Sequence, residues 1–235
     1  MQDFGDSFRL ALGLVASGDS QLLEIILLSL RVSLTAVAVA CLIGLPLGAA
    51  LAVGRFPGRT ALVVLVNALM GQPPVVVGLV IYLLLSNAGP LGWLQLLYTP
   101  TAMIIAQIVL ITPIVVALSR EIVEQLYSEY AEQFRSLCLT RAQAVRALLW
   151  DARYSLLTVG LAGFGRAIAE VGAVIIVGGN IAHLTRVMTT AIALETSKGD
   201  LALALALGIV LMTIALSVNA AVMMLRMTAS RHVYA

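Results

Sequence analysis

Two residues of opposite charge lie deep inside an apolar stretch of this 235-residue chain. Arg166 and Glu170, in the run GFGRAIAEVG, are four residues apart, so a helix would place them on one face, where they can pair. An unpaired charge at membrane depth costs at least ~2.5 kcal/mol, so we expect this pair to face protein or water rather than acyl chains. It either fixes helix packing or serves as a gate or positive station on an anion path.

A second unusual feature is Gln72-Pro73-Pro74, in the middle of another apolar stretch. Two prolines remove backbone donors and are expected to break or kink a helix, as a packing kink or as the lining of a polar path. Asn180 belongs to a Gly-Gly-Asn turn that ends a later apolar stretch. The candidate residues of a translocation path or gate are therefore Gln72, Pro73, Pro74, Arg166, Glu170 and Asn180.

No enzyme site is found in the sequence. Lys198 is the only lysine, which excludes a phosphate-binding loop of the GxxxxGK[ST] type. His183 and His232 stand alone, without the spacing of a metal site. A nucleophile-elbow serine is also absent. We expect no catalytic residue, no cofactor and no metal in this chain.

The composition indicates a polytopic membrane protein. Hydrophobic residues make up 61% of the chain, charged residues 11%, and the mean hydropathy is +1.04, more than a soluble core of this size needs. Stretches of at least roughly 20 apolar residues predict an all-α fold with about five spans. We place these spans at 21–54, 60–86, 99–119, 153–178 and 201–226. The transmembrane domain is then 21–226, after an external flank 1–20 and before a cytoplasmic tail 227–235.

Arginine placement sets the predicted orientation. Arginines follow the first and last spans, and five more lie in residues 120–153, called the charged loop here. By the positive-inside rule the charged loop and the C-terminus are cytoplasmic, and the N-terminus is outside. A short outer helix is expected within 185–200, where Arg186 and Lys198 either attract anions or act as interface anchors.

The charged loop is predicted to form two short helices. Leu126, Tyr130, Phe134 and Leu137 share one helix face, and a break is expected at Cys138-Leu139. Thr140 with Gln143 resembles a capping box that starts a second helix, ending near Trp150. The loop is either a solvated connector or a docking surface for a soluble partner. Its balanced charges argue against nucleic-acid binding.

The charged loop also resembles a known motif. YAEQFRSLCLTRAQAVRALLWDA is similar to the EAA loop that permease subunits of ABC importers present to their ATPase. The resemblance places the acid on Glu132, the family glycine on Cys138 and a closing apolar residue on Leu148. Because Cys138 replaces a glycine suited to positive φ, the turn is expected to differ in conformation or to be mildly strained. The implied coupling residues are Glu132, Cys138, Thr140, Arg141 and Leu148.

The rest of the chain resembles one branch of that family. Residues 72–92, 148–166 and 163–200 are similar to tungstate importer permeases, and more loosely to molybdate and sulfate permeases. The resemblance implies a type I ABC importer permease fold in a bacterial or archaeal inner membrane. Its implied partners are a second copy of the chain, a cytoplasmic ATPase dimer that binds ATP and Mg²⁺, an extracytoplasmic tungstate-binding protein and membrane lipid.

Other functions stay open at this point. Within the family, molybdate or sulfate are alternative substrates, since sequence physics does not separate these tetrahedral anions. An ion-gradient-driven secondary transporter would need an internal repeat and coupling carboxylates within its spans, for which only Glu170 is available. A membrane anchor without transport would leave the broken second span and the buried pair unexplained.

Overall fold

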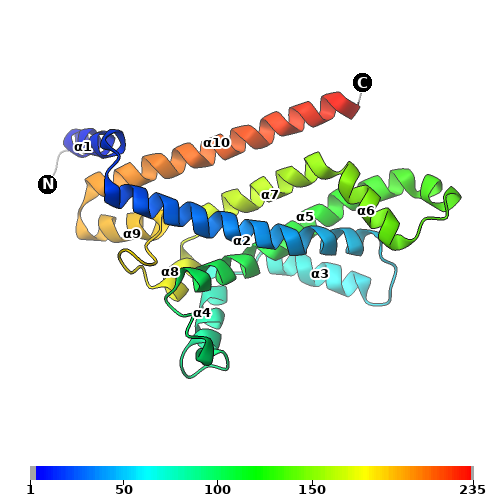
Figure 1. The fold of residues 1–235 in the computed structure, drawn as a ribbon, viewed down its shortest axis with the longest axis horizontal. Helices are drawn as coiled ribbons and strands as arrows, with labels where there is room; N and C mark the ends of the chain where they lie inside the picture. Colours follow the sequence, from blue (N-terminus) through cyan, green and yellow to red (C-terminus); the bar gives the residue numbers. More distant parts are fainter. Residues whose placement is uncertain (1–3, 234–235) are drawn as a thin grey trace. The chain divides into compact units, whose positions relative to one another are not determined.

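The computed structural model describes the backbone of residues 4–233, and within this range every regular element is helical (Figure 1). Residues 1–3 and 234–235, at the ends of the expected flank and tail, lie outside the described residues. The elements are α1 (Phe4–Ser17), α2 (Ser20–Val53), α3 (Arg59–Met70), α4 (Pro74–Leu85), the 3₁₀ turn η1 (Gly92–Leu94), α5 (Pro100–Ser136), α6 (Arg141–Asp151), α7 (Arg153–Ile168), α8 (Gly172–Gly178), α9 (Met188–Lys198) and α10 (Leu201–Val233).

The all-α polytopic fold class is confirmed. Of the described helices, α2, α5 and α10 are each long and apolar enough to cross a membrane. The pairs α3–α4 and α7–α8 are bent at short breaks, and the count rises to five if each pair forms one span. Each segment overlaps one of the five predicted from hydropathy, although α5 extends well past the predicted end at 119 and the predicted span 153–178 is broken between α7 and α8. The predicted breaks are present at Gly71–Pro73 and after Gly178.

The charged loop differs from the prediction in one respect. Its first half is not a separate short helix, because α5 continues without interruption from Pro100 to Ser136. The helical face predicted for 126–137 is therefore an extension of the third span. Pro113 lies inside α5 without ending it.

The chain forms two compact units. The first comprises residues 1–35, 73–107 and 165–218, and the second comprises residues 36–72, 108–164 and 219–235. Helices α2, α5, α7 and α10 each contribute one part to each unit. Each unit is thus built from segments that are distant in the sequence.

In the second unit, α2 packs tightly on α5 through two glycines one turn apart. A Cβ on Gly44 would lie 2.8 Å from Val115 Cγ1, and one on Gly48 would lie 2.6 Å from the Val116 carbonyl and overlap Ser119 Oγ. Ser119 is fully buried, and its hydroxyl donates to the Gly44 carbonyl at 3.4 Å and to the Val116 carbonyl at 3.2 Å. Small residues at this spacing let membrane helices approach closely. Because lipid provides no hydrophobic driving force between helices, the van der Waals contacts of this close approach hold them together.

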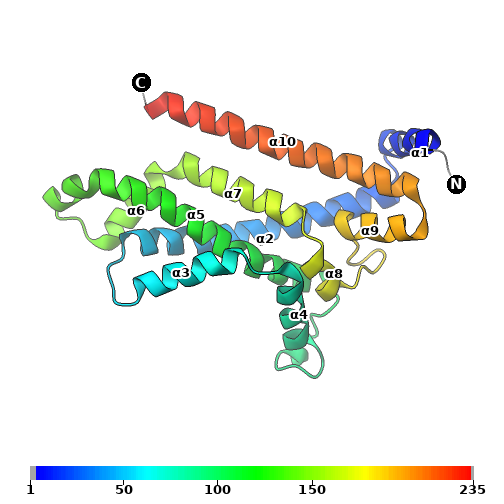
Figure 2. The same ribbon diagram turned by 180° about the vertical axis from the view of Figure 1, so that it is seen from behind.

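In the first unit, α4 lies against α8, as both ribbon views show (Figures 1 and 2). A Cβ on Gly78 would lie 2.7 Å from Ala173 Cα, so backbone meets backbone at this point. The end of α8 is tied to the segment before α5, because the Tyr98 amide donates to the Val177 carbonyl at 2.9 Å.

The outward faces of the long helices are apolar. Leu42 is 77% exposed, and Leu27, Met212 and Leu216 are each more than 60% exposed. Apolar surface of this kind is what acyl chains cover, whereas a water-soluble domain rarely shows it in continuous stretches.

We predict that Gly48→Ala destabilises the protein, by about 1–3 kcal/mol, because the added methyl collides with backbone and with a buried hydroxyl. The measurement is thermal unfolding of the purified chain in detergent. Gly208→Ala in α10 is the matched control, since a Cβ there meets nothing within 4 Å. Equal melting temperatures for the two variants would contradict the close α2–α5 approach.

Candidate functional site

The turn of the charged loop keeps a left-handed conformation without a glycine. Cys138 has φ 52°, the Leu139 amide donates to the Phe134 carbonyl at 3.1 Å, and the Cys138 amide donates to the Arg135 carbonyl at 3.1 Å. These bonds close the end of α5 as a glycine would. The turn geometry is therefore retained, and the left-handed backbone of a non-glycine residue costs ~1–2 kcal/mol there.

The predicted capping box is confirmed. Thr140 has an extended backbone and precedes α6, its Oγ1 accepts from the Gln143 amide at 3.4 Å, and the Thr140 amide donates to Gln143 Oε1 at 2.9 Å. Two amides that a helix start leaves free are thereby satisfied. The role of Thr140 is to fix where α6 begins.

The loop is anchored to the helices of the second unit by a small apolar core. Ala144 and Leu148 of α6 are buried against Ala49, Ala52 and Val53 of α2 and Val123 of α5. Leu126, Tyr130 and Phe134 pack on this core, as their spacing predicted, while Leu137 is 68% exposed. Leu148, a predicted coupling residue, is thus fully buried and holds α6 in place.

A hydrogen bond closes the loop across its two helices. Tyr130 donates to Asp151 Oδ2 at 3.0 Å, which joins α5 to the end of α6. Both residues lie in the charged part of the chain, and this bond to the carboxylate raises the pKa of Tyr130.

The surface that the loop presents contains Glu132 and Arg141, both exposed. Leu137 and Trp150 are also exposed, at 68% and 72%, although they belong to the charged segment. An open hollow of about 850 Å³ lies on α6, lined by Gln143, Arg146, Ala147 and Trp150 among others. Exposed apolar groups beside charges, on a rigid helix pair, are typical of a docking surface.

One ion network was missed from sequence. Glu124 accepts from Arg59 Nη2 at 2.7 Å and also from Arg120, while Arg59 Nε donates to the Leu51 carbonyl at 2.8 Å. In the sequence, Glu124 is one of several acidic residues that balance the arginines of the charged loop. The sequence does show Arg59 shortly after the first span, but its partner Glu124 is 65 residues away and no local pattern connects the two.

In the first unit, α4 begins at Pro74, with Pro73 in an extended conformation as its N-cap. The predicted break at the two prolines is confirmed. Gln72 belongs to the second unit, where its amide donates to the Val109 carbonyl at 3.5 Å. Its place on a translocation path stays a prediction.

Arg166 and Glu170 form the expected ion pair. Their exposure is unequal, because the Glu170 side chain is 5% exposed and that of Arg166 is 39% exposed. The two residues do not share one uninterrupted helix, since α7 ends at Ile168 and Glu170 lies in the break before α8. Glu170 Oε1 also accepts from the Ala173 amide at 3.2 Å, so the same carboxylate caps α8.

Side chains from two other helices hold this break. Gln107 Nε2 of α5 donates to the Ala167 carbonyl at 3.1 Å, and Thr189 Oγ1 of α9 donates to the Glu170 carbonyl at 2.9 Å. Gln107 is a buried polar residue of an apolar helix, and an interhelical bond satisfies its side chain. Thr189 was not singled out, because nothing in its local sequence, a threonine near a helix start, distinguishes it.

The start of α4 and the break before α8 lie together in the first unit. A Cβ on Gly172 would lie 2.7 Å from Val75 Cγ2 and 3.6 Å from Glu170 Oε1, so the start of α4 and the start of α8 are neighbours. Pro73 and Pro74 thus lie next to the segment that carries Glu170. Asn180 lies beyond the other end of α8, and its backbone is left-handed. Its side-chain Nδ2 donates to the Thr190 carbonyl at 3.2 Å.

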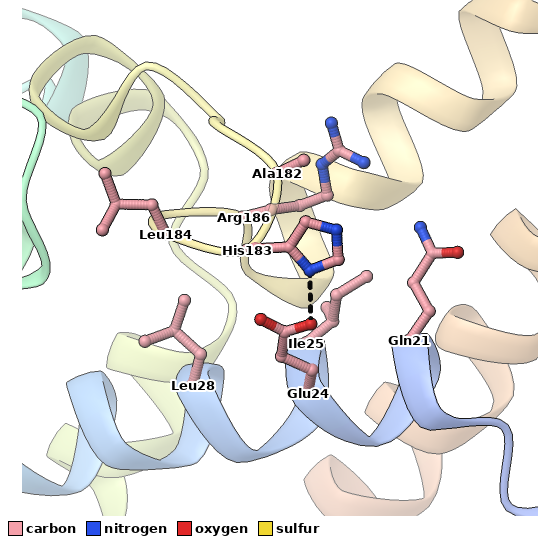
Figure 3. A pocket seen from close by; sticks show the side chains of 8 residues that line it. All are labelled: Gln21, Glu24, Ile25, Leu28, Ala182, His183, Leu184 and Arg186. Atoms are coloured by element: carbon pink, nitrogen blue, oxygen red, sulfur yellow. Dashed lines mark hydrogen bonds and ion pairs between the residues drawn. The ribbon is translucent and has the colours of Figure 1, made fainter.

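Arg186 and Lys198 share one carboxylate, which neutralises only part of their positive charge. Arg186 Nη1 lies 3.8 Å and Lys198 Nζ 3.0 Å from Glu195 Oε1, and the Glu195 side chain is 6% exposed. Figure 3 shows the nearby pocket, in which Glu24 of α2 faces His183. Glu24 Oε2 and His183 Nδ1 are 2.8 Å apart. Among the described residues no group of histidine, cysteine or acidic side chains has the arrangement of a metal site.

Comparison with known proteins matches residues 44–227 to the family described as binding-protein-dependent transport system inner membrane component. The chain is 41% identical to the tungstate uptake system permease protein of Peptoclostridium acidaminophilum, over 94% of this chain and 97% of that protein. It is 37% identical to the tungstate uptake system permease protein of Campylobacter jejuni, over 91% and 90%. A sulfate transport system permease protein of Salmonella typhimurium is 32% identical over 69% of this chain and 61% of that protein.

Substitutions at Cys138 are predicted to change stability in a fixed order. Cys138→Gly relieves the left-handed strain, and Cys138→Val increases it because a β-branched side chain is least tolerated at positive φ. We expect a spread of about 1–2 kcal/mol between these two variants in thermal unfolding. Cys138→Ala is the control and should match the unsubstituted chain. A valine variant as stable as the glycine variant would contradict the turn geometry.

The Arg166–Glu170 pair is predicted to respond asymmetrically to charge removal. Arg166→Gln leaves a buried carboxylate without its cation and should cost about 3 kcal/mol. Glu170→Gln should cost less, because the amide oxygen still accepts from Ala173 and the remaining arginine is partly exposed. Thermal unfolding of both single variants and the double variant measures the coupling. Equal losses for the two single variants would contradict this account.

Proposed function

Because the chain belongs to the family of binding-protein-dependent transport system inner membrane components, we propose that it is the permease subunit of an ATP-driven importer of tungstate. The observation that supports tungstate as the substrate is how much of the chain is similar to each group of relatives. Relatives named for tungstate uptake match about nine-tenths of the chain or more, whereas the sulfate relative matches about two-thirds at lower identity. The family favours this function over a secondary transporter.

The charged loop is the part that we propose binds the ATPase. Glu132 is exposed near the end of α5, and the capping box and the left-handed turn fix the orientation of α6 beside it. ATP and Mg²⁺ would be bound by the separate ATPase subunits, and this chain would not hydrolyse ATP. Closure of the ATPase dimer would then move the charged loop of each of two permease copies as a rigid body.

The anchoring of the loop supports this coupling. Leu148 and Ala144 are buried against α2 and α5, and α5 is one continuous helix from the loop into the apolar span. A tightly packed core transmits displacement with little compression. A displacement of the charged loop would therefore move α2 and α5 together.

The anion would pass between two copies of the chain, near the paired helix breaks of the first unit. Arg166 is partly exposed and supplies positive charge, while Glu170 limits that charge and holds the break. A path of this kind needs weak attraction, because tight binding would stop release. In this proposal the N-terminus is outside, the C-terminus is inside, and an extracytoplasmic binding protein supplies most of the selectivity.

The substrate is tested by ATP-driven uptake into proteoliposomes that contain this chain, its ATPase and its binding protein. Tungstate, molybdate and sulfate are compared at equal concentration. We expect uptake of tungstate to exceed that of the other two anions. Preferential uptake of molybdate or sulfate would overturn the substrate, and uptake without ATP would overturn the importer.

Glu132→Lys is predicted to abolish coupled uptake and the stimulation of ATP hydrolysis, because it reverses the charge at the docking surface. Glu121→Lys is the matched control, an exposed acid of the same helix that lies ~16 Å nearer the apolar span. Membrane insertion and melting temperature should be unchanged for both variants. Normal uptake by the Glu132 variant would contradict the docking proposal.

A further inference from the structure

An open apolar groove of about 520 Å³ runs between α2 and α7 in the second unit. Leu42, Pro46, Leu156 and Leu157 are among the residues that line it, and every lining residue except Arg153 is apolar or small. Gly160 keeps the groove open, because its missing side chain exposes the region around Cys41, whose sulfur would lie 3.4 Å from a Cβ at that position.

Arg153 lies on the rim of this groove beside two exposed aromatic rings. Its guanidinium carbon is 4.9 Å from the ring centre of Trp150 and 4.7 Å from that of Tyr154, which are 72% and 51% exposed. Tryptophan and tyrosine of this kind are enriched at the boundary between hydrocarbon and water. The arginine end of the groove thus has the composition typical of the membrane surface.

The charge of Arg153 is not neutralised within the described part of the chain. Arg59, Arg120, Arg166 and Arg186 each approach a carboxylate, whereas the only polar contact of the Arg153 side chain there is a bond from Nη1 to the Trp150 carbonyl at 2.9 Å. Asp151, two residues away, accepts from Tyr130 instead. A cation with remaining donors is thus held at the membrane surface, above an apolar groove.

The groove extends over about two thirds of the hydrocarbon depth of one leaflet. Gly160 is seven residues from Arg153 along α7, a rise of ~10 Å. The hydrocarbon of one leaflet is ~15 Å thick, half of the whole core. A molecule with an anionic head and an apolar chain would match both the length and the charge of this feature.

We propose that this groove binds an anionic glycerophospholipid, with its phosphate on Arg153 and one acyl chain between α2 and α7. Guanidinium groups bind phosphate through paired, charge-assisted hydrogen bonds, and the cation stays held by its aromatic neighbours. The net charge of the head group should affect affinity, because no carboxylate in the described residues balances Arg153. An anionic head supplies that missing negative charge, whereas a zwitterionic head carries its own cation.

The test is native mass spectrometry of the detergent-purified full chain, titrated with palmitoyl-oleoyl phosphatidylglycerol and, separately, with the phosphatidylcholine of the same chains. We expect the unsubstituted chain to bind phosphatidylglycerol more tightly. Arg153→Gln should weaken phosphatidylglycerol binding about tenfold and phosphatidylcholine binding by less, because both lipids lose the phosphate contact but only the anionic head loses its sole counter-charge. Arg135→Gln, which removes the same charge from an exposed position of the charged loop, is the control and should have no effect.

A second variant tests the acyl-chain site. Gly160→Leu fills the groove without touching Arg153 and should weaken the binding of both lipids. Gly208→Leu, at a glycine on a different groove on α10, is the matched control and should not change binding to the α2–α7 groove. Circular dichroism melting of each variant excludes loss of fold as the cause.

Two results would overturn the proposal. Equal affinity for both lipids, unchanged in Arg153→Gln, would show that only non-specific boundary lipid occupies the groove. A disulfide between two copies through Cys41, formed by oxidation of the Cys138→Ser chain in membranes, would show that a second copy covers the groove instead. We expect no such cross-link. Neither outcome depends on transport, so failure here leaves the proposed importer function untouched.

Discussion

The structure depends on one constraint, that backbone polar groups at membrane depth must find partners within the protein. The break between α7 and α8 meets it with three side chains: Glu170 accepts from the Ala173 amide, Gln107 donates to the Ala167 carbonyl and Thr189 donates to the Glu170 carbonyl. The break before α4 meets it differently, because Pro73 and Pro74 have no amide hydrogen to satisfy. Two irregular segments can therefore lie side by side in an apolar region.

The Arg166–Glu170 pair follows from the same constraint. A carboxylate that caps α8 inside protein needs a cation, and Arg166 supplies it from the last turn of α7. Because the arginine is the more exposed partner, the pair presents residual positive charge and keeps its negative charge buried. The structural role and the proposed role on an anion path are thus compatible, since one pair can hold the break and face the path.

The second unit combines close helix packing with the ion network of Glu124. Gly44 and Gly48 bring α2 against α5, and the same two helices bury Ala144 and Leu148 of the charged loop. A loop that would be mobile as a solvated connector is held as a rigid extension of two membrane helices. Its exposed residues, Glu132 among them, therefore lie on a helix pair that is packed onto α2 and α5.

The sequence alone determined the five apolar segments, the breaks at the two prolines and after Gly178, and the capping box, because each depends on hydropathy or on neighbours within a few residues. It did not determine that α5 continues into the charged loop, because a separate amphipathic helix and an extension of a span have the same sequence pattern. The partners of Glu124, Glu170 and Glu195 also needed the tertiary structure, because the choice among many arginines and polar groups rests on which distant helices pack together. Local chemistry fixed the elements, and long-range packing decided which side chains meet.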